Sequence, residues 1–137
     1  MNTAPRAEEV EDVYITEEQV RASEQAHLWS GGWGWTVCAW HRPSGRLVGD
    51  TEPGSSTHRR WLAVQGDTGV DPTHRNLGLG RWAKATNALR LLKDRPDTQV
   101  IETWNVGVNA SMLTINGAMD FRPVAEWQEW RLAIHRK

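Results

Sequence analysis

Hydrophobic and polar positions near the start of the chain follow the spacing of a helix. Thr16 and Gln19 form a capping-box pattern, so a helix is predicted to begin there and to run to about Trp29. Its core-facing side chains are expected to be Val20, Ala26 or His27, and Leu28. The polar, acidic residues 1–15 are expected to be flexible.

Aromatic and β-branched residues then predict three strands. Residues 35–41 and 46–51 form a hairpin joined by a turn that contains proline and glycine. A polar loop over residues 52–60 follows, and residues 61–70 form the third strand. Gly66 lies in the middle of this strand, where a glycine often marks a bulge or a close approach of the backbone.

The apolar spacing becomes helical again from Gly80. A stripe on one face of this helix is expected to point to the core: Trp82, Ala85, Leu89 and Leu92. Pro96 stops the helix, because proline cannot continue its hydrogen bonding.

The remaining segments complete a sheet covered by helices. A fourth strand is expected over residues 98–104, and Asn109 can cap a further helix that runs to about Met119. Residues 121–124 and 127–134 are interpreted as closing strands. This order of elements predicts a single α/β (α+β) domain over residues 16–137, with a mixed sheet and flanking helices.

Composition excludes several classes of protein. The chain of 137 residues has ordinary hydrophobic (39%) and charged (24%) fractions, so it is neither disordered nor fibrous. A single cysteine, Cys38, allows no intramolecular disulfide and no four-cysteine metal site, and we expect no metal. No apolar run is long enough for a membrane span or a signal peptide, so a soluble, cytoplasmic protein is expected. The net charge of -1 argues against nucleic acid as the main partner.

Nine tryptophans beside one tyrosine and one phenylalanine are unusual. They can fill the core and a subunit interface, or they can form a stacking surface for an aromatic ligand. The first interpretation is favoured, because aromatic residues dominate burial in cores and interfaces.

The segment that carries chemistry joins the third strand to the helix after it. Gly78 and Gly80 let the backbone approach a ligand, and the start of the helix offers unpaired N–H groups and the positive end of its dipole. Such a corner binds phosphate oxygens, and Arg75 and Arg81 can add positive charge at its rim.

Three interpretations of this segment compete. The glycines can simply turn the chain. They can also belong to a dinucleotide fingerprint, since residues 78–83 fit G-x-G-x-x-G/A, but a long loop separates them from the strand and the chain before it is a β-meander. The third interpretation is the pyrophosphate loop R/Q-x-x-G-x-G/A, which Arg75, Gly78 and Gly80 match.

The third interpretation is favoured because a wider resemblance supports it. From about residue 35 to residue 134 the chain resembles the GNAT (Gcn5-related) N-acetyltransferase superfamily, and most of all the C-terminal domain of tandem actinobacterial acetyltransferases. Val70-Asp71-Pro72 is similar to the family's V-x-P before the loop. The residues from Asn109 to Leu113, with Phe121 beyond, resemble its N-x-x-(M/A)-L … G-F motif.

The resemblance implies acetyl-CoA or another acyl-CoA as co-substrate, bound where the fourth and fifth strands of the family splay apart. Residues 68–70 would pair with pantetheine, the loop's N–H groups would hold the pyrophosphate, and two asparagines would approach the pantetheine. The implied binding residues are Thr68, Gly69, Val70, Arg75, Asn76, Leu77, Gly78, Leu79, Gly80, Arg81, Asn105 and Asn109.

The resemblance also implies direct attack by a bound amine, which needs a base and an acid. Asp67 is the favoured base, with Glu52 and Glu102 behind it. The family's usual acid, a tyrosine seven residues after the helix asparagine, corresponds to Asn116, which cannot donate a proton as an acid does. Asp120 replaces the glycine before Phe121, and aspartate tolerates the left-handed conformation required there.

The segment before Thr16 is too short for the family's first strand and helix, so an N-terminally truncated domain is expected. An uncovered sheet edge would then be closed by a second copy or by another GNAT-like domain. The leading function is acyl-CoA-dependent N-acyl transfer to a small amine. The alternatives are a catalytically degenerate domain that binds acyl-CoA or a partner, and acyl transfer from a carrier other than CoA.

Overall fold

The computed structural model describes residues 15–128, 130 and 132–134. Within them, no helix is long and apolar enough to cross a membrane. The helices are α1 (Glu17–Trp29), α2 (Leu79–Asp94) and α3 (Ala110–Ala118), with short 3-10 turns at Thr57–Arg59 and Pro72–His74. The strands are β1 (Gly32–Gly34), β2 (Val37–His41), β3 (Arg46–Ser56), β4 (Leu62–Val70) and β5 (Val100–Glu102).

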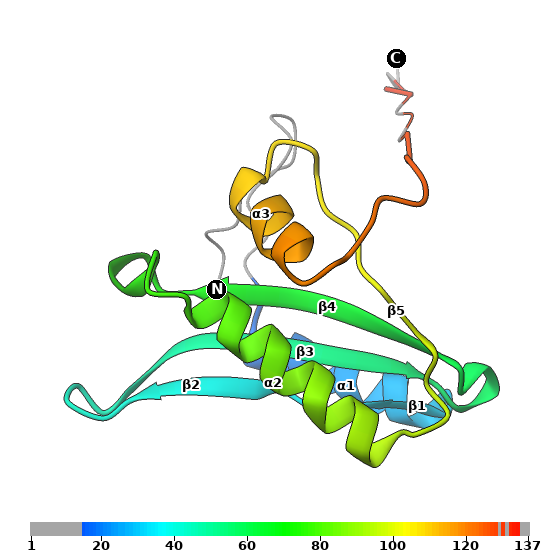
Figure 1. The fold of residues 1–137 in the computed structure, drawn as a ribbon. Helices are drawn as coiled ribbons and strands as arrows, with labels where there is room; N and C mark the ends of the chain where they lie inside the picture. Colours follow the sequence, from blue (N-terminus) through cyan, green and yellow to red (C-terminus); the bar gives the residue numbers. More distant parts are fainter. Residues whose placement is uncertain (1–14, 129, 131, 135–137) are drawn as a thin grey trace.

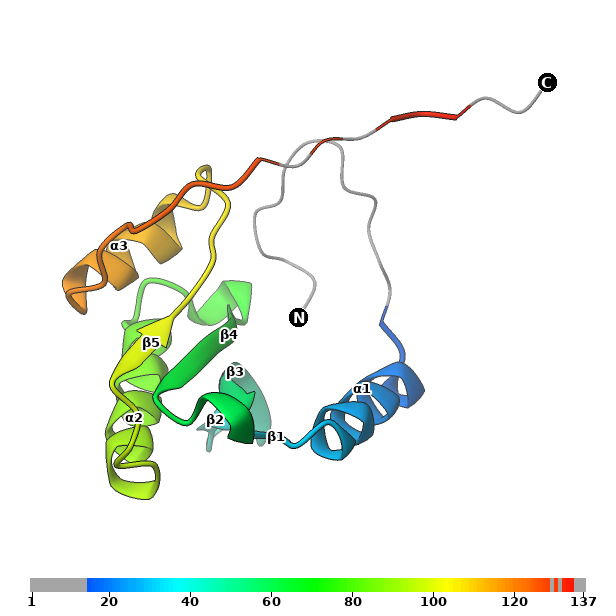
Figure 2. The same ribbon diagram turned by 90° about the vertical axis from the view of Figure 1, so that its right-hand side faces the viewer.

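The strands form one mixed, mostly antiparallel sheet, as the sequence predicts. β3 pairs with β1 and β2 on one side and with β4 on the other, and only β5 runs parallel to its neighbour β4. Helix α2 covers one face of this sheet and α1 lies on the opposite side (Figures 1 and 2). Helix α3 lies beyond the β4 edge, after the chain has left β5 (Figure 2).

Three strand predictions need correction. The strand expected over 35–41 is shorter and forms β2, and a further strand that the sequence did not predict, β1, precedes it and pairs with β3 in the same register. The loop expected over 52–60 is wrong for residues 52–56, which continue β3 because β1 and β4 pair with them on both sides. The strand expected over 98–104 contracts to β5, since only three residues pair with β4.

Helix α1 is confirmed, but its expected core face is wrong. Thr16 Oγ1 accepts a hydrogen bond from Gln19 N, and the Gln19 side chain accepts one from Thr16 N, so the capping box is formed. Val20 and Leu28 are nevertheless exposed, and no residue of α1 is buried. The helix contacts β1 at the edge of the sheet, which offers it little apolar surface.

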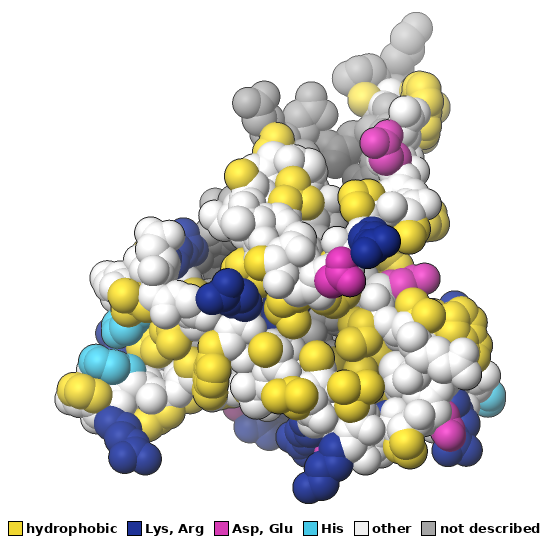
Figure 3. Space-filling view, in the orientation of Figure 1, with side chains coloured by type: hydrophobic (Ala, Val, Ile, Leu, Met, Phe, Trp, Pro, Cys, Tyr) yellow, Lys and Arg dark blue, Asp and Glu magenta, His cyan; other side chains and the backbone are white. Residues whose placement is uncertain are grey.

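The expected core stripe of α2 is also on the wrong face. Trp82, Leu89 and Leu92 point to solvent, and they are 52–70% exposed. The buried face consists of Gly80, Ala83, Lys84, Asn87 and Leu91. Gly80 and Ala83 are small and let the start of the helix lie close to its neighbours, while the bulky apolar positions lie on its outer side. Figure 3 shows hydrophobic side chains gathered over this outer face.

Tryptophan supplies one part of the core. Trp33 is buried and stacks on the half-buried Trp35, with ring centroids 5.1 Å apart. Trp35 Nε1 donates a hydrogen bond to Asn87 Oδ1 (2.8 Å), which ties the β1–β2 connection to α2. The other seven tryptophans are 47–90% exposed, so the core part of the prediction that tryptophan fills the core and a subunit interface holds for two of the nine.

The closing strands expected over residues 121–124 and 127–134 are not formed by the residues that the structure describes there. This part of the chain leads away from the sheet (Figures 1 and 2). Its apolar side chains are 79–90% exposed: Val124, Trp127, Trp130, Leu132 and Ile134. Before it, Asp120 adopts φ 62°, so the predicted left-handed helix end is confirmed.

Candidate active site

A cavity opens where β4 and β5 separate. Their pairing ends at Val64 and Glu102, after which β4 continues beside β3 while the other chain turns towards α3. The space between them has a volume of about 830 Å³ and is walled by β3, β4, α2, α3 and residues 103–106. The splayed strands inferred from the resemblance are therefore present in this structure.

A bulge in β4 shapes one end of the cavity. Thr51 pairs with Thr68 and Pro53 with Gln65, so Gly66 and Asp67 together oppose the single residue Glu52. This is the bulge that Gly66 predicts. A Cβ at Gly66 would lie 3.1 Å from the Glu52 side chain, so the glycine lets the two strands approach.

Buried polar side chains hold this bulge in place. Gln65 Nε2 donates to the Glu52 carbonyl (2.9 Å) and to Thr51 Oγ1 (2.7 Å), which also lies 2.7 Å from Thr68 Oγ1. Sequence reasoning missed Thr51 and Gln65, because nothing in their spacing marks them as neighbours.

The loop that contains Gly78 and Gly80, here called the glycine loop, lies at the other end of the cavity. Gly78 has φ 79° and is the N-cap of α2, and Asn76 has φ 62°. No described side chain caps the first turn of α2, so its N–H groups are available to a ligand. A Cβ at Gly80 would lie 3.2 Å from Ile115 Cδ1, so this glycine also serves the packing of α2 against α3.

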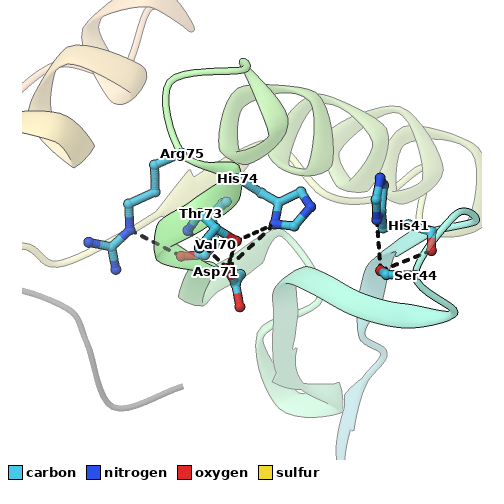
Figure 4. A network of polar contacts seen from close by, with 7 residues as sticks. All are labelled: His41, Ser44, Val70, Asp71, Thr73, His74 and Arg75. Carbon is cyan, nitrogen blue, oxygen red and sulfur yellow. Dashed lines mark hydrogen bonds and ion pairs between the residues drawn. The ribbon is translucent and has the colours of Figure 1, made fainter.

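A polar network supports the loop from beneath (Figure 4). Asp71 Oδ1 accepts hydrogen bonds from Thr73 N (2.9 Å) and from the Thr73 hydroxyl, and His74 Nδ1 lies 3.4 Å away. The Thr73 hydroxyl is the main reason that the pKa of Asp71 falls to about 2. Arg75 Nε donates to the Val70 carbonyl (3.1 Å), so Arg75 braces the loop as well as lining the cavity.

Three carboxylates lie near the bulge: Asp50, Glu52 and Asp67. Burial raises the pKa of Glu52 above its usual value, and the negative charges of Asp67 and Asp50 raise it further. Burial also raises the pKa of Asp50. A carboxylate with a raised pKa is a better proton acceptor near neutral pH.

Lys84 is the functional candidate that sequence reasoning missed. It is 1% exposed, it lines the cavity, and its Nζ donates to Asn116 Oδ1 over 2.6 Å. The same ammonium lies 5.0 Å from the centroid of the Phe121 ring. Burial lowers the pKa of Lys84 to about 8.

Most of the predicted site residues meet in this cavity. Those that line it are Asp67, Thr68, Gly69, Val70, Arg75, Asn76, Gly78, Leu79, Gly80, Arg81, Asn105 and Asn109. Leu77 does not line it and is 69% exposed. Asn116 is buried behind the wall and reaches the cavity through Lys84. Asn109 also caps α3, since its Oδ1 accepts from Met112 N (3.2 Å).

Within the described part of the chain, no group of three or more His, Cys, Asp or Glu side chains could hold a metal ion.

Splayed β4 and β5 above a glycine-lined helix start define the fold of the GNAT acetyltransferases, and the chain has this fold. The resemblance to this superfamily is confirmed by solved structures. One of them is a tandem GNAT protein from the clavulanic acid biosynthesis pathway, with 30% sequence identity and a TM-score of 0.74. The match covers 77% of this chain and 33% of that protein, so this chain spans about a third of its length.

Two further structures share the fold at lower identity. AAC(6')-Iy, in complex with the bisubstrate analogue CoA-S-monomethyl-acetylneamine, has 12% identity, a TM-score of 0.63 and coverage of 87% of this chain and 82% of that one. The aminoglycoside 6'-N-acetyltransferase AAC(6')-Ih from Acinetobacter baumannii has 12% identity, a TM-score of 0.57 and coverage of 88% and 84%. No protein-family model and no curated protein matches the chain.

Proposed function

We propose that this protein is an N-acyltransferase that moves an acetyl or other acyl group from acyl-CoA to a small amine. The observation that carries the proposal is the continuous cavity from the uncapped start of α2 to the carboxylates at the β4 bulge. The start of α2 suits the anionic pyrophosphate of the donor, and the carboxylates at the bulge suit the amine acceptor. The acetyltransferases with the same fold support this function.

The cavity fits acyl-CoA in its chemistry. The N–H groups of residues 76–81 and the Arg81 guanidinium would hold the pyrophosphate at the positive end of α2. Residues 68–70 and the side chains of Asn105 and Asn109 would line the pantetheine. The thioester would then lie near Gly66, where a backbone N–H at the bulge could stabilise a developing oxyanion.

The carboxylates at the bulge suit an amine acceptor. The sequence predicts Asp67 as the base, and we place Glu52 beside it, since the pKa of Glu52 is raised and its side chain contacts Gly66. An amine would lose its proton to this pair, directly or through water, and attack the thioester without a covalent enzyme intermediate. Acidic walls also favour cationic amines, the class to which the aminoglycoside acceptors of the neighbours belong.

Thiol release from acetyl-CoA across a panel of amines tests the proposal, run beside calorimetric titration with CoA. Amine-dependent thiol release is the expected result. CoA binding without release would favour the degenerate binding domain. Absence of CoA binding would exclude acyl-CoA as donor and leave acyl transfer from another carrier.

We also propose that the domain pairs with a second copy or with another GNAT-like domain. Large apolar side chains are exposed on the outer face of α2 and along residues 124–134. Exposed apolar patches of this kind mark interaction sites.

A further inference from the structure

We infer that Lys84 is the acid of the acyl transfer, and that its ammonium gives a proton to the sulfur of the departing CoA. The inference deepens the proposed function and rests on it. The position that the family usually fills with a tyrosine is Asn116 here, and an amide cannot supply that proton. The structure places the Lys84 ammonium, which comes from a different helix, within 2.6 Å of Asn116 Oδ1.

The position of the Lys84 side chain supports this assignment. Lys84 lies one helical turn after Gly80, on the face of α2 that forms the cavity wall. Its Nζ is held by Asn116 Oδ1 at 2.6 Å and lies over the Phe121 ring, so the ammonium is fixed between α2 and α3. An ammonium has three donors, and Asn116 occupies one of them. The other two N–H donors of Lys84 can point into the cavity. Asn116 is a positioning residue, because it acts by holding the Lys84 ammonium in place.

The charges around the cavity leave the ammonium without a carboxylate partner. Asp50 and Glu52 come from β3, Asp67 from β4, His74 and Arg75 from the loop, and Arg81 from α2. Among the described residues, Lys84 forms no ion pair with any of them. Burial is therefore the main influence on the charge of Lys84, and its pKa of about 8 is close to that of a thiol. A proton can then pass to sulfur with little energetic penalty.

The proton balance of the step is complete. The C–N bond forms as the amine attacks, and the amine proton passes to the carboxylate pair at the bulge. The C–S bond breaks, its electron pair stays on sulfur, and the Lys84 proton neutralises it. The products are the amide and CoA thiol, and solvent afterwards restores the proton of Lys84 and removes the one on the carboxylate.

The test compares the protein with Lys84→Met, which keeps the length and apolar stem of the side chain but removes the charge. Lys93→Met, at an exposed lysine of the same helix, is the matched control. The first readout needs no turnover: calorimetric affinities for CoA and for desulfo-CoA, which lacks the thiol, between pH 6 and pH 9. An ammonium beside the sulfur lowers the thiol pKa by about one unit or more, so the preference for CoA should rise by roughly twofold or more up to about pH 8 and fall again above it, where Lys84 loses its own proton.

Lys84→Met should abolish this rise, and Lys93→Met should retain it. The second readout is kcat, which should fall above about pH 8 in the parent protein, because the acid must be protonated. In Lys84→Met, kcat should be lower by roughly 10²–10⁴-fold and should lose this alkaline limb.

The outcomes separate the two proposals. Tight CoA binding with a preference over desulfo-CoA that does not change with pH in the parent protein would overturn the role of Lys84 and leave acyl transfer in place. This measurement holds even if Lys84→Met does not fold. Failure to bind CoA at all would remove the proposed function and this inference with it.

Discussion

Gln65 Nε2 on β4 donates a 2.9 Å hydrogen bond to the backbone carbonyl of Glu52 on β3, at the bulge between the two strands. A bulge leaves a backbone group without its usual partner in the sheet, and the Gln65 side chain satisfies it. The same nitrogen also donates to Thr51 Oγ1, so one buried amide fixes the strand that carries Glu52.

Replacement of Gln65 by methionine should therefore destabilise the fold. The variant keeps the volume but leaves the Glu52 carbonyl unsatisfied, which costs about 1–3 kcal/mol. Thermal unfolding should show a lower Tm than for Gln99→Met, a control at an exposed glutamine near the same sheet. Equal Tm values for the two variants would show that the amide does not hold the bulge.

Reversal of charge at Arg81 should weaken CoA binding. Arg81 is exposed at the start of α2, where a glutamate is compatible with the helix dipole, so Arg81→Glu should fold normally. Loss of an attractive charge and gain of a repulsive one should lower CoA affinity by roughly tenfold or more in calorimetry. Arg59→Glu makes the same change of net charge away from the cavity and should bind CoA like the parent. If both variants bind equally well, the pyrophosphate does not lie at this loop.

The two carboxylates of the bulge should respond differently to removal of their charge. A base must be deprotonated, so kcat should rise with pH through the raised pKa of Glu52. Glu52→Gln should lower kcat by roughly 10²–10⁴-fold. Asp67→Asn removes a negative charge that raises the pKa of Glu52. The rise of kcat with pH in this variant should therefore occur at lower pH than in the parent protein. Should Asp67→Asn abolish turnover while Glu52→Gln is silent, Asp67 is the base. CoA affinity, unchanged in both, is the control.

Local signals predicted much of this molecule. The capping box of α1, the glycine of the β4 bulge and the glycine loop before α2 all depend on neighbours in sequence, and each is found where expected. The inward face of α2 could not be predicted in this way. Its outer positions are the more apolar ones, and only the sheet determines which face it accepts.

The contact between Lys84 and Asn116 shows the same limit in the site. The two residues are 32 positions apart and on different helices, so no spacing connects them. The available signal was a lysine on the helix face that Gly80 and Ala83 also occupy, where small side chains indicate close packing. A charged residue on a helix face of small side chains is therefore expected to be buried.

Lys84 should also make stability depend on pH. Its pKa is about 8 in the folded protein, and the unfolded chain holds the same proton up to about pH 10.4. Between these values the unfolded state binds more protons, so the free energy of unfolding should rise with pH. The difference in Tm between the parent and Lys84→Met should therefore shift in favour of the parent from pH 8 to pH 10. A constant difference would mean that the folded lysine keeps its ordinary pKa.

The exposed apolar residues predict that the protein is not a monomer. Trp82, Leu89 and Leu92 form an apolar outer face on α2, and residues 124–134 carry further exposed tryptophan and aliphatic side chains. A stable pair should bury about 1,200 Å² or more, which surfaces of this kind can supply. Light scattering over a dilution series should give a mass above 15.5 kDa at micromolar concentration.

Leu89→Lys should shift the equilibrium towards the monomer, whereas Leu28→Lys, at an exposed leucine of α1, should not. A mass of 15.5 kDa at every concentration, with an intact melting transition, would contradict self-pairing and leave another GNAT-like domain as the partner to test.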